Sequence, residues 1–222
     1  MVQPFNDIAS QYDLLNDFLS LGLHRLWKKR LVHELLESKP NPDRVLDIAT
    51  GTGDLAALLA EKISPTAIWG LDPSLAMMET GKAKYPFLKN WIQGSAEAIP
   101  FAAKELTLIT CTFGVRNFQD RLKAFSEIAR VLKSGGLLGI IEIHPIPEKL
   151  VYFPLRLFWN YVVPALGAFF KKKTAYEYLR DTGAGFISCE VMIKELAKDF
   201  KLRVRRTLIP GGLVSFLIFE KR

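Results

Sequence analysis

Residues 47–54, Asp-Ile-Ala-Thr-Gly-Thr-Gly-Asp, combine two glycines with acidic and hydroxyl side chains. Gly51 and Gly53 permit backbone conformations that bring the main chain close to a ligand. The segment follows an apolar run and precedes a helix pattern, so we expect free helix N–H groups that attract a carboxylate or a phosphate. Thr50 and Thr52 lie inside the loop and are candidate ligand contacts. These features predict a nucleotide-binding turn.

Two acidic residues indicate which nucleotide this turn binds. Asp72 ends the next predicted strand, about twenty residues on, where a carboxylate can accept hydrogen bonds from two ribose hydroxyls. Gly51, Gly53 and Ala56 also satisfy the loose dinucleotide fingerprint, which is weak evidence alone. Asp47 favours another cofactor, because a carboxylate there repels a pyrophosphate but suits the ammonium of a methionine moiety. We therefore expect S-adenosylmethionine, with S-adenosylhomocysteine as product, rather than a nicotinamide cofactor.

Strands and helices are expected to alternate around this turn. Apolar runs predict strands at residues 44–50, 67–72, 90–93, 106–113 and 137–143. Helices are expected at residues 54–63 with Asp54 as N-cap, from Ser74 onwards, and from Asp120 to Gly135-Gly136 with Leu122 on the apolar face. Such alternation predicts a parallel sheet that is covered on both faces.

The C-terminal part of the chain departs from this alternation. A helix is expected near residues 188–200, followed by two β-rich runs at 202–209 and 213–219. Pro210-Gly211-Gly212 between the runs is typical of a hairpin. The predicted fold class is therefore α/β, of the class I Rossmann-like methyltransferase type. Its seven-stranded sheet is mostly parallel, with an antiparallel strand in the C-terminal hairpin.

Length and composition fit one folded domain over residues 1–222. Hydrophobic residues make up 49% of the chain and charged residues 24%, which excludes a disordered or disulfide-stapled protein. The two cysteines and three histidines show no metal-ligand spacing, so no metal is expected. We expect four segments, namely an N-terminal helical arm (1–42), a cofactor-binding core (43–144), a helical insertion that covers the substrate (145–185), and a closing helix with hairpin (186–222).

Residues 151–170 belong to the most apolar part of the chain, but two prolines, an arginine and an asparagine interrupt them. We therefore expect helices on a membrane surface or over the substrate rather than a spanning helix. A helix pair packed on the core, with Lys171–Lys173 as a solvated end, is the alternative. The formal net charge of +7 suits a protein at the cytoplasmic face of an anionic membrane, although charge alone fits nucleic acid as well.

Motifs along nearly the whole chain resemble those of one enzyme family. The specific ones are an N-terminal group within residues 5–28, which includes Gly22–Lys28, and Phe113-Gly114-Val115-Arg116-Asn117. Residues 45–56 and 94–101 match more generic cofactor-binding motifs. With these motifs the chain resembles the ubiquinone/menaquinone biosynthesis C-methyltransferases, which include demethylmenaquinone methyltransferases. The resemblance implies that Ser95 and Ala96 border the adenine.

The resemblance also implies a catalytic neighbourhood at Arg116 and Asn117. Arg116 follows the fourth predicted strand, at the edge where ligands bind in such sheets, and a guanidinium there can stabilise a phenolate oxygen. Asn117 can orient that oxygen or a water. Tyr12 and Asp13 on the arm can close over the site, and Asp13 is a candidate base. The alternatives are that Arg116 pairs with Asp120 on the surface and that Tyr12 is a core aromatic.

Two further residues are candidates for the site because they lie at or near the ends of predicted strands. Thr112, near the end of the fourth strand, is a candidate cofactor contact, and His144 after the fifth strand is a weaker candidate base. Ser95 stands where the family usually has Asp or Asn, and Ile143-His144 stand where it has Phe-Ser. Because most departures fall in the substrate-covering half, they affect the identity of the quinol more than the cofactor.

We therefore predict methylation of a ring carbon of a prenylated quinol in respiratory quinone biosynthesis, either demethylmenaquinol to menaquinol or the equivalent ubiquinone precursor. Another small apolar acceptor stays open, as do a non-catalytic quinone- or lipid-binding role and a homodimer. Nucleic acid is not expected as a substrate, because the strand that ends in Thr110–Gly114 lacks an Asn/Asp-Pro-Pro-Tyr motif and a Pro-Cys nucleophile. Tail length and the choice between benzoquinol and naphthoquinol are not determined.

Overall fold

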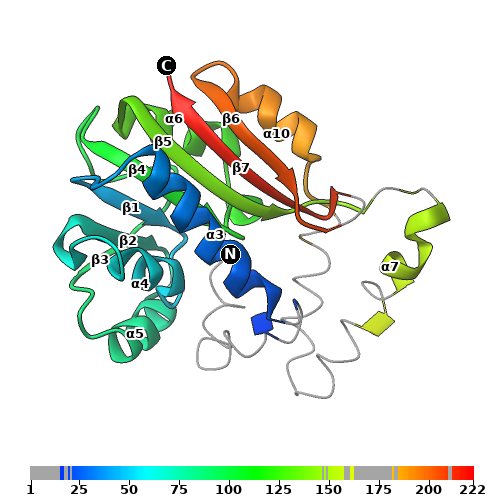
Figure 1. Cartoon of the computed structure of the whole chain (residues 1–222), viewed down its shortest axis with the longest axis horizontal. Coiled ribbons are helices and arrows are strands. Elements are labelled where there is room, and N and C mark those ends of the chain that lie inside the picture. Colours follow the sequence, from blue (N-terminus) through cyan, green and yellow to red (C-terminus); the bar gives the residue numbers. More distant parts are fainter. Residues whose placement is uncertain are drawn as a thin grey trace.

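The computed structural model describes residues 16, 17, 20, 22–146, 148, 150–157, 161, 162, 182, 185–209 and 212–222. Its centre is a seven-stranded sheet with the order β3-β2-β1-β4-β5-β7-β6 (Figure 1). The strands are β1 (Val45–Ile48), β2 (Ile68–Asp72), β3 (Asn90–Gln93), β4 (Leu106–Thr112), β5 (Leu132–Ile143), β6 (Phe200–Thr207) and β7 (Val214–Lys221). Strands β1 to β5 pair in parallel, whereas β7 is antiparallel to both β5 and β6. This topology confirms the predicted fold class.

Helices cover both faces of the sheet. The longer ones are α3 (Leu23–Ser38), α4 (Asp54–Ala60), α5 (Leu75–Lys84), α6 (Arg121–Val131) and α10 (Cys189–Leu196), and the short ones are η2 (Pro65–Ala67), η3 (Val115–Asn117), η4 (Leu150–Tyr152) and α7 (Phe153–Leu157). Val45 and Leu108 pack with α3 and α4, whereas Leu46 and Ile109 pack with α6 and α10. Successive residues of one strand therefore serve opposite faces, as the β-pleat requires.

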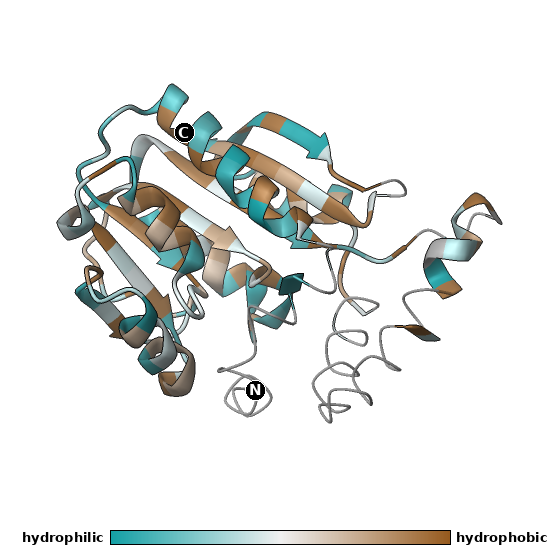
Figure 2. Ribbon diagram, turned by 60° about the horizontal axis from the view of Figure 1, so that its bottom comes forward, coloured by the Kyte–Doolittle hydropathy of each residue, from teal (hydrophilic) through white to brown (hydrophobic). Residues whose placement is uncertain are grey.

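Hydropathy follows this layering, with apolar residues concentrated in the strands and polar ones on the outward helix faces (Figure 2). The edge strand β6 carries Lys201, Arg203 and Arg205 at alternate positions, a pattern that discourages pairing with another sheet. Among the described residues, no helix combines the length and apolar character that crossing a membrane requires.

The helix after β1 begins at Asp54 as predicted, but its predicted N-cap residue and its predicted end are wrong. Gly53, with a φ of 83°, occupies the N-cap position, so Asp54 is the first helical residue rather than the cap. The helix ends at Ala60 instead of Ile63, and Pro65 begins the 3₁₀ helix η2.

The predicted end of helix α6 is also wrong. Helix α6 ends at Val131, and β5 begins at once because Leu132 is fully buried and pairs with Leu106. The Gly135-Gly136 pair lies inside β5, where the register shifts so that Leu108 pairs with Leu137. Leu122 is 58% exposed rather than part of the apolar face, which consists mainly of Ala124, Phe125, Ile128 and Ala129.

The close seating of α3 on the sheet yields a testable expectation. A Cβ at Gly139 in β5 would lie 2.8 Å from Leu35 Cδ1 and 3.1 Å from Leu31 Cδ1, and both leucines are fully buried. We expect Gly139→Ala to lower the free energy of unfolding by about 1–3 kcal/mol, because overpacking forces α3 away from the sheet. Equilibrium urea denaturation measures this, with the exposed Ser134→Ala as control. Equal stability of the two variants would contradict this packing.

Candidate functional site

The loop after β1 contains three residues with positive φ, namely Ala49 at 52°, Gly51 at 57° and Gly53 at 83°. Positive φ is uncommon for a residue other than glycine, so Ala49 marks locally strained backbone of the kind that clusters at binding sites. Hydrogen bonds hold the loop in place, because Thr50 N donates to Leu71 O (3.1 Å) and Gly53 N donates to Thr50 O (2.9 Å). The predicted glycine turn between β1 and α4 is therefore present.

Asp47 lies within β1 and is only 2% exposed. Its Oδ1 accepts a hydrogen bond from Thr110 Oγ1 and its Oδ2 accepts one from Thr50 Oγ1, both at 2.7 Å. Burial raises the pKa of Asp47 to about 6, against the lowering effects of these two hydrogen bonds and of the Lys28 ammonium. The site thus contains a buried carboxyl group that changes charge just below neutral pH.

Asp72 at the end of β2 joins two turns. Its Oδ2 accepts a hydrogen bond from Gly51 N and its Oδ1 accepts one from Ser74 N, both at 2.8 Å. Burial raises the pKa of Asp72, while the two backbone hydrogen bonds lower it. The carboxylate therefore lies directly beside the glycine loop, as its position in the sequence predicted.

A cavity of about 140 Å³ opens next to these turns. Its lining comes from Ile48 and Ala49 after β1, Leu71 and Pro73 around the end of β2, Gly94 to Glu97 after β3, and Gly114 with Asn117 to Gln119 after β4. The structure thus brings the predicted residues Ser95, Ala96 and Asn117 together around one cavity. Thr112 does not line it, since it ends β4 opposite Ile141 of β5.

Arg116 lies in η3 and points away from the surface. Its Nη1 lies 2.6 Å from Glu142 Oε1, and the two side chains are 4% and 0% exposed. Arg116 N also donates to Glu142 Oε2 (3.1 Å), while Arg116 Nε is buried and finds no hydrogen-bond partner among the described residues. The alternative of a surface pair with Asp120 is wrong, because the buried carboxylate of Glu142 requires a cation and Asp120 instead caps α6 by accepting from Lys123 N.

His144 has both ring nitrogens engaged. Nδ1 lies 2.9 Å from Ile187 O and Nε2 lies 2.7 Å from Ser215 Oγ. Since a carbonyl can only accept, Nδ1 carries the proton, and the Ser215 hydroxyl donates to Nε2 in the neutral ring. His144 is 2% exposed and stacks on Phe186, so these contacts give it a structural role rather than that of a base.

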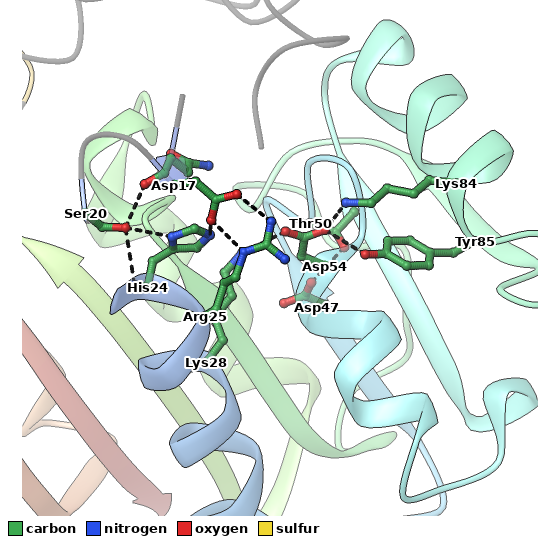
Figure 3. A network of polar contacts seen from close by, with 11 residues as sticks. Asp17, Ser20, His24, Arg25, Lys28, Asp47, Thr50, Asp54, Lys84 and Tyr85 are labelled. Atoms are coloured by element: carbon green, nitrogen blue, oxygen red, sulfur yellow. Dashed lines mark hydrogen bonds and ion pairs between the residues drawn. The ribbon is translucent and has the colours of Figure 1, made fainter. Parts of the chain in front are cut away.

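The N-terminal end of α3 lies beside the glycine loop (Figure 3). Arg25 binds Asp17 through two hydrogen bonds, Nε to Oδ1 at 2.5 Å and Nη2 to Oδ2 at 2.6 Å. His24 Nδ1 lies 2.7 Å from Ser20 Oγ. Burial, assisted by the charge of Lys28, lowers the pKa of His24 to about 4, so its imidazole is neutral near pH 7.

Asp54, the first residue of α4, connects three helices. Its Oδ1 accepts hydrogen bonds from Lys84 Nζ (2.7 Å) and Tyr85 Oη (2.9 Å), and its Oδ2 lies 3.7 Å from Lys28 Nζ of α3 (Figure 3). Burial acts to raise the pKa of Asp54, but the charges of Lys28 and Lys84 hold it below its usual value. The glycine loop is thus fixed from both sides.

Tyr12 and Asp13 lie outside the described residues, so their proposed closure over the site stays a prediction. Sequence reasoning missed Glu142, although it is the one charged residue in the apolar run Leu137–Ile143. It also missed Lys28, which belongs to the family-like N-terminal segment but carried no assigned role there.

Comparison with known sequences agrees with the geometry. The chain matches the ubiE/COQ5 methyltransferase family over residues 1–220. This chain belongs to that family. It is 38% identical over 201 residues to a demethylmenaquinone methyltransferase of Thermotoga maritima. This match covers 88% of this chain and 85% of the relative. It is 35% identical to a ubiquinone/menaquinone biosynthesis C-methyltransferase of Campylobacter jejuni, with 88% and 86% covered.

The fold is shared with solved methyltransferase structures. One from Thermotoga maritima, described as an S-adenosylmethionine-dependent methyltransferase and possible histamine N-methyltransferase, superposes with a TM-score of 0.67. The match covers 100% of both chains at 21% sequence identity, so it supports the fold alone. The family and the fold together identify the chain as an S-adenosylmethionine-dependent methyltransferase.

The described residues fit this cofactor. Strands β1 and β2 carry the Asp47 and Asp72 carboxylates near their C-terminal ends, and these carboxylates suit an ammonium and ribose hydroxyls, respectively. The cavity beside them is lined by apolar side chains such as Ile48 and Leu71 and by backbone, which suits a flat aromatic base. These residues are the candidate cofactor contacts together with Thr50, Gly51, Thr52 and Gly53.

The pH dependence of cofactor binding tests the role of Asp47. If its carboxylate binds the ammonium, protonation removes the attraction, so affinity falls as the pH drops through the raised pKa of about 6. We expect the Kd of S-adenosylhomocysteine, measured by calorimetry, to rise about tenfold between pH 7.5 and pH 5. Asp47→Asn should bind weakly with little pH dependence, whereas Asp72→Asn should retain the Asp47 transition. A flat wild-type profile would exclude this role.

Proposed function

We propose that the chain transfers a methyl group from S-adenosylmethionine to a ring carbon of a prenylated quinol, as in the conversion of demethylmenaquinol to menaquinol. The observation that carries the proposal is the buried Arg116, whose Nε has no acceptor in the described part of the chain. Arg116 lies in the same 3₁₀ helix as Asn117, which lines the cavity. The names of the relatives support a quinol as the acceptor.

The task of the protein in such a transfer follows from the chemistry. When bound, the cofactor supplies an electrophilic methyl group on a sulfonium. A quinol ring carbon becomes nucleophilic when the neighbouring hydroxyl loses its proton. The protein must therefore align the carbon with the methyl group, exclude water and stabilise the phenolate oxygen.

Arg116 suits the last of these tasks. A buried N–H group without an acceptor is unfavourable, and a ligand oxygen at Nε would remove that cost. The ion pair with Glu142 holds the guanidinium in one orientation, and arginine keeps its charge at any relevant pH. Asn117, at the cavity edge, is positioned to orient the same oxygen or a water. His144 is unsuited as the base because its ring nitrogens are both bound, so Asp13 stays the candidate.

A prenyl tail or a membrane surface would account for the exposed apolar side chains around α7. Several apolar side chains around α7 are solvent-exposed, namely Val151 (73%), Phe153 (48%), Leu157 (41%), Tyr161 (69%) and Val162 (42%). Burial of apolar groups contributes about 0.8 kcal/mol per methylene, so such a surface suits a lipid tail or the membrane that contains it. Peripheral contact with an anionic membrane is part of the proposal.

A methyl-transfer assay tests the acceptor and the role of Arg116. Protein, S-adenosylmethionine and a reduced short-tail demethylmenaquinol should yield a quinone with one added ring methyl group by mass spectrometry. The double variant Arg116→Gln/Glu142→Gln removes both buried charges together, so no unpaired carboxylate confuses the result. We expect its kcat to fall by about 10²–10³-fold, as for loss of an oxyanion donor, with cofactor affinity retained.

Arg121→Gln/Glu195→Gln is the control, because Arg121 also forms a close ion pair with Glu195 (2.7 Å), between α6 and α10 and more exposed than the Arg116 pair. It should leave kcat unchanged. Full activity in the Arg116 double variant would contradict the role of this residue. Wild-type protein that binds the cofactor but yields no methylated quinone would contradict the quinol acceptor and favour another small apolar acceptor.

Vesicle binding tests the exposed apolar surface. Phe153→Asp and Tyr161→Asp should each weaken co-sedimentation with vesicles that contain phosphatidylglycerol by about tenfold, because burial of an aromatic side chain is lost and a like charge is added. Leu122→Asp is the matched control, since Leu122 is 58% exposed on α6. If all three variants sediment like the wild type, this surface does not contact the membrane.

A further inference from the structure

Lys28 of α3 lies on the same face of the sheet as the buried carboxylate of Asp47. Val45 packs with α3 and α4, and residues two apart on a strand share a face, so Asp47 also points toward these helices. Leu31 and Leu35 anchor α3 on β5 next to Gly139. Core packing therefore fixes the part of α3 from which the Lys28 side chain extends.

The Lys28 side chain is largely buried, and its ammonium is incompletely paired. Its side chain is 9% exposed, and its nearest anion is Asp54 Oδ2 at 3.7 Å, which is beyond hydrogen-bond distance. Throughout the described part of the chain, Nζ donates no hydrogen bond, although an ammonium has three donors. Because a charge on a largely buried side chain is stabilised by ion pairing and hydrogen bonding, this arrangement leaves room for an anionic partner.

Lys84 provides the internal comparison. It contacts the same carboxylate, but its Nζ lies 2.7 Å from Asp54 Oδ1, and Tyr85 Oη occupies the same oxygen at 2.9 Å. Asp54 is therefore neutralised without Lys28. A lysine required only for Asp54 would be expected at a similarly short distance.

We propose that Lys28 binds the carboxylate of the methionine moiety of the cofactor, while Asp47 binds the ammonium of the same moiety. The inference rests on the use of S-adenosylmethionine by this chain and adds a residue to that site. An α-amino acid presents opposite charges side by side, and Lys28 and Asp47 present the complementary charges from α3 and β1. The electrostatic influence of Lys28 on Asp47 agrees with this proximity.

The test compares two ligands that differ only in the group at issue. S-adenosylmethionine and its decarboxylated analogue share the adenosine, sulfonium and amine, but only the first has a carboxylate. Wild-type protein should prefer S-adenosylmethionine by more than about tenfold in calorimetry, as expected for a charge-assisted hydrogen bond. Lys28→Met should lose about ten- to a hundredfold in affinity for S-adenosylmethionine and keep its affinity for the analogue.

Lys84→Met is the matched control, because it removes the other lysine from Asp54 and should preserve the ratio of the two affinities. Lys28→Arg keeps the charge and should retain part of the preference. An equal loss for both ligands in Lys28→Met would overturn the proposal, since it indicates an indirect effect on the loop. Absence of a preference in the wild type would overturn it without any variant. Failure of the wild type to bind either ligand would instead overturn the proposed cofactor use, and this inference with it.

Discussion

The candidate site depends on the burial of one carboxyl group, that of Asp47. A rise in pKa from 3.8 to about 6 means that keeping Asp47 ionised in the folded protein costs about 3 kcal/mol. The folded state binds this proton more tightly than the unfolded state, so the cost is absent below pH 4 and fully present above pH 6. This cost already includes the opposing effects of the hydrogen bonds from Thr50 and Thr110. A ligand cation next to Asp47 would offset this cost, so the strand is suited to a partner that the chain itself does not supply.

The position of that carboxylate follows from the sheet. Strands β1, β2 and β4 are parallel neighbours, so the turns that follow them meet at one edge. Asp72 fastens two of these turns through Gly51 N and Ser74 N, and Asp54 fastens the loop to α3 and α5. The strained backbone at Ala49 is therefore held by contacts on both sides, which is the condition under which such strain persists.

The parts of the molecule that the sequence predicted are those that depend on local pattern. The glycine turn, Asp72 and the antiparallel C-terminal hairpin all followed from spacing and from runs of apolar residues. The Gly135-Gly136 pair led to a wrong prediction of the end of helix α6, because glycine often ends a helix. Here β5 begins earlier, at Leu132, which pairs with Leu106. Local sequence does not contain that pairing.

The ion-pair partners of the charged residues were the least predictable, because they come from distant parts of the sequence. Arg116 was compared with Asp120, four positions away, but its partner Glu142 comes from a neighbouring strand. Lys28 approaches Asp54 and Asp47 only because α3 packs across the sheet. These long-range contacts place a cation from outside the core segment beside the glycine loop. Under the proposed contacts, the described sheet edge and α3 together bind the zwitterionic part of the cofactor. The acceptor, by contrast, is expected to contact the segments in which the sequence analysis found the most departures from the family.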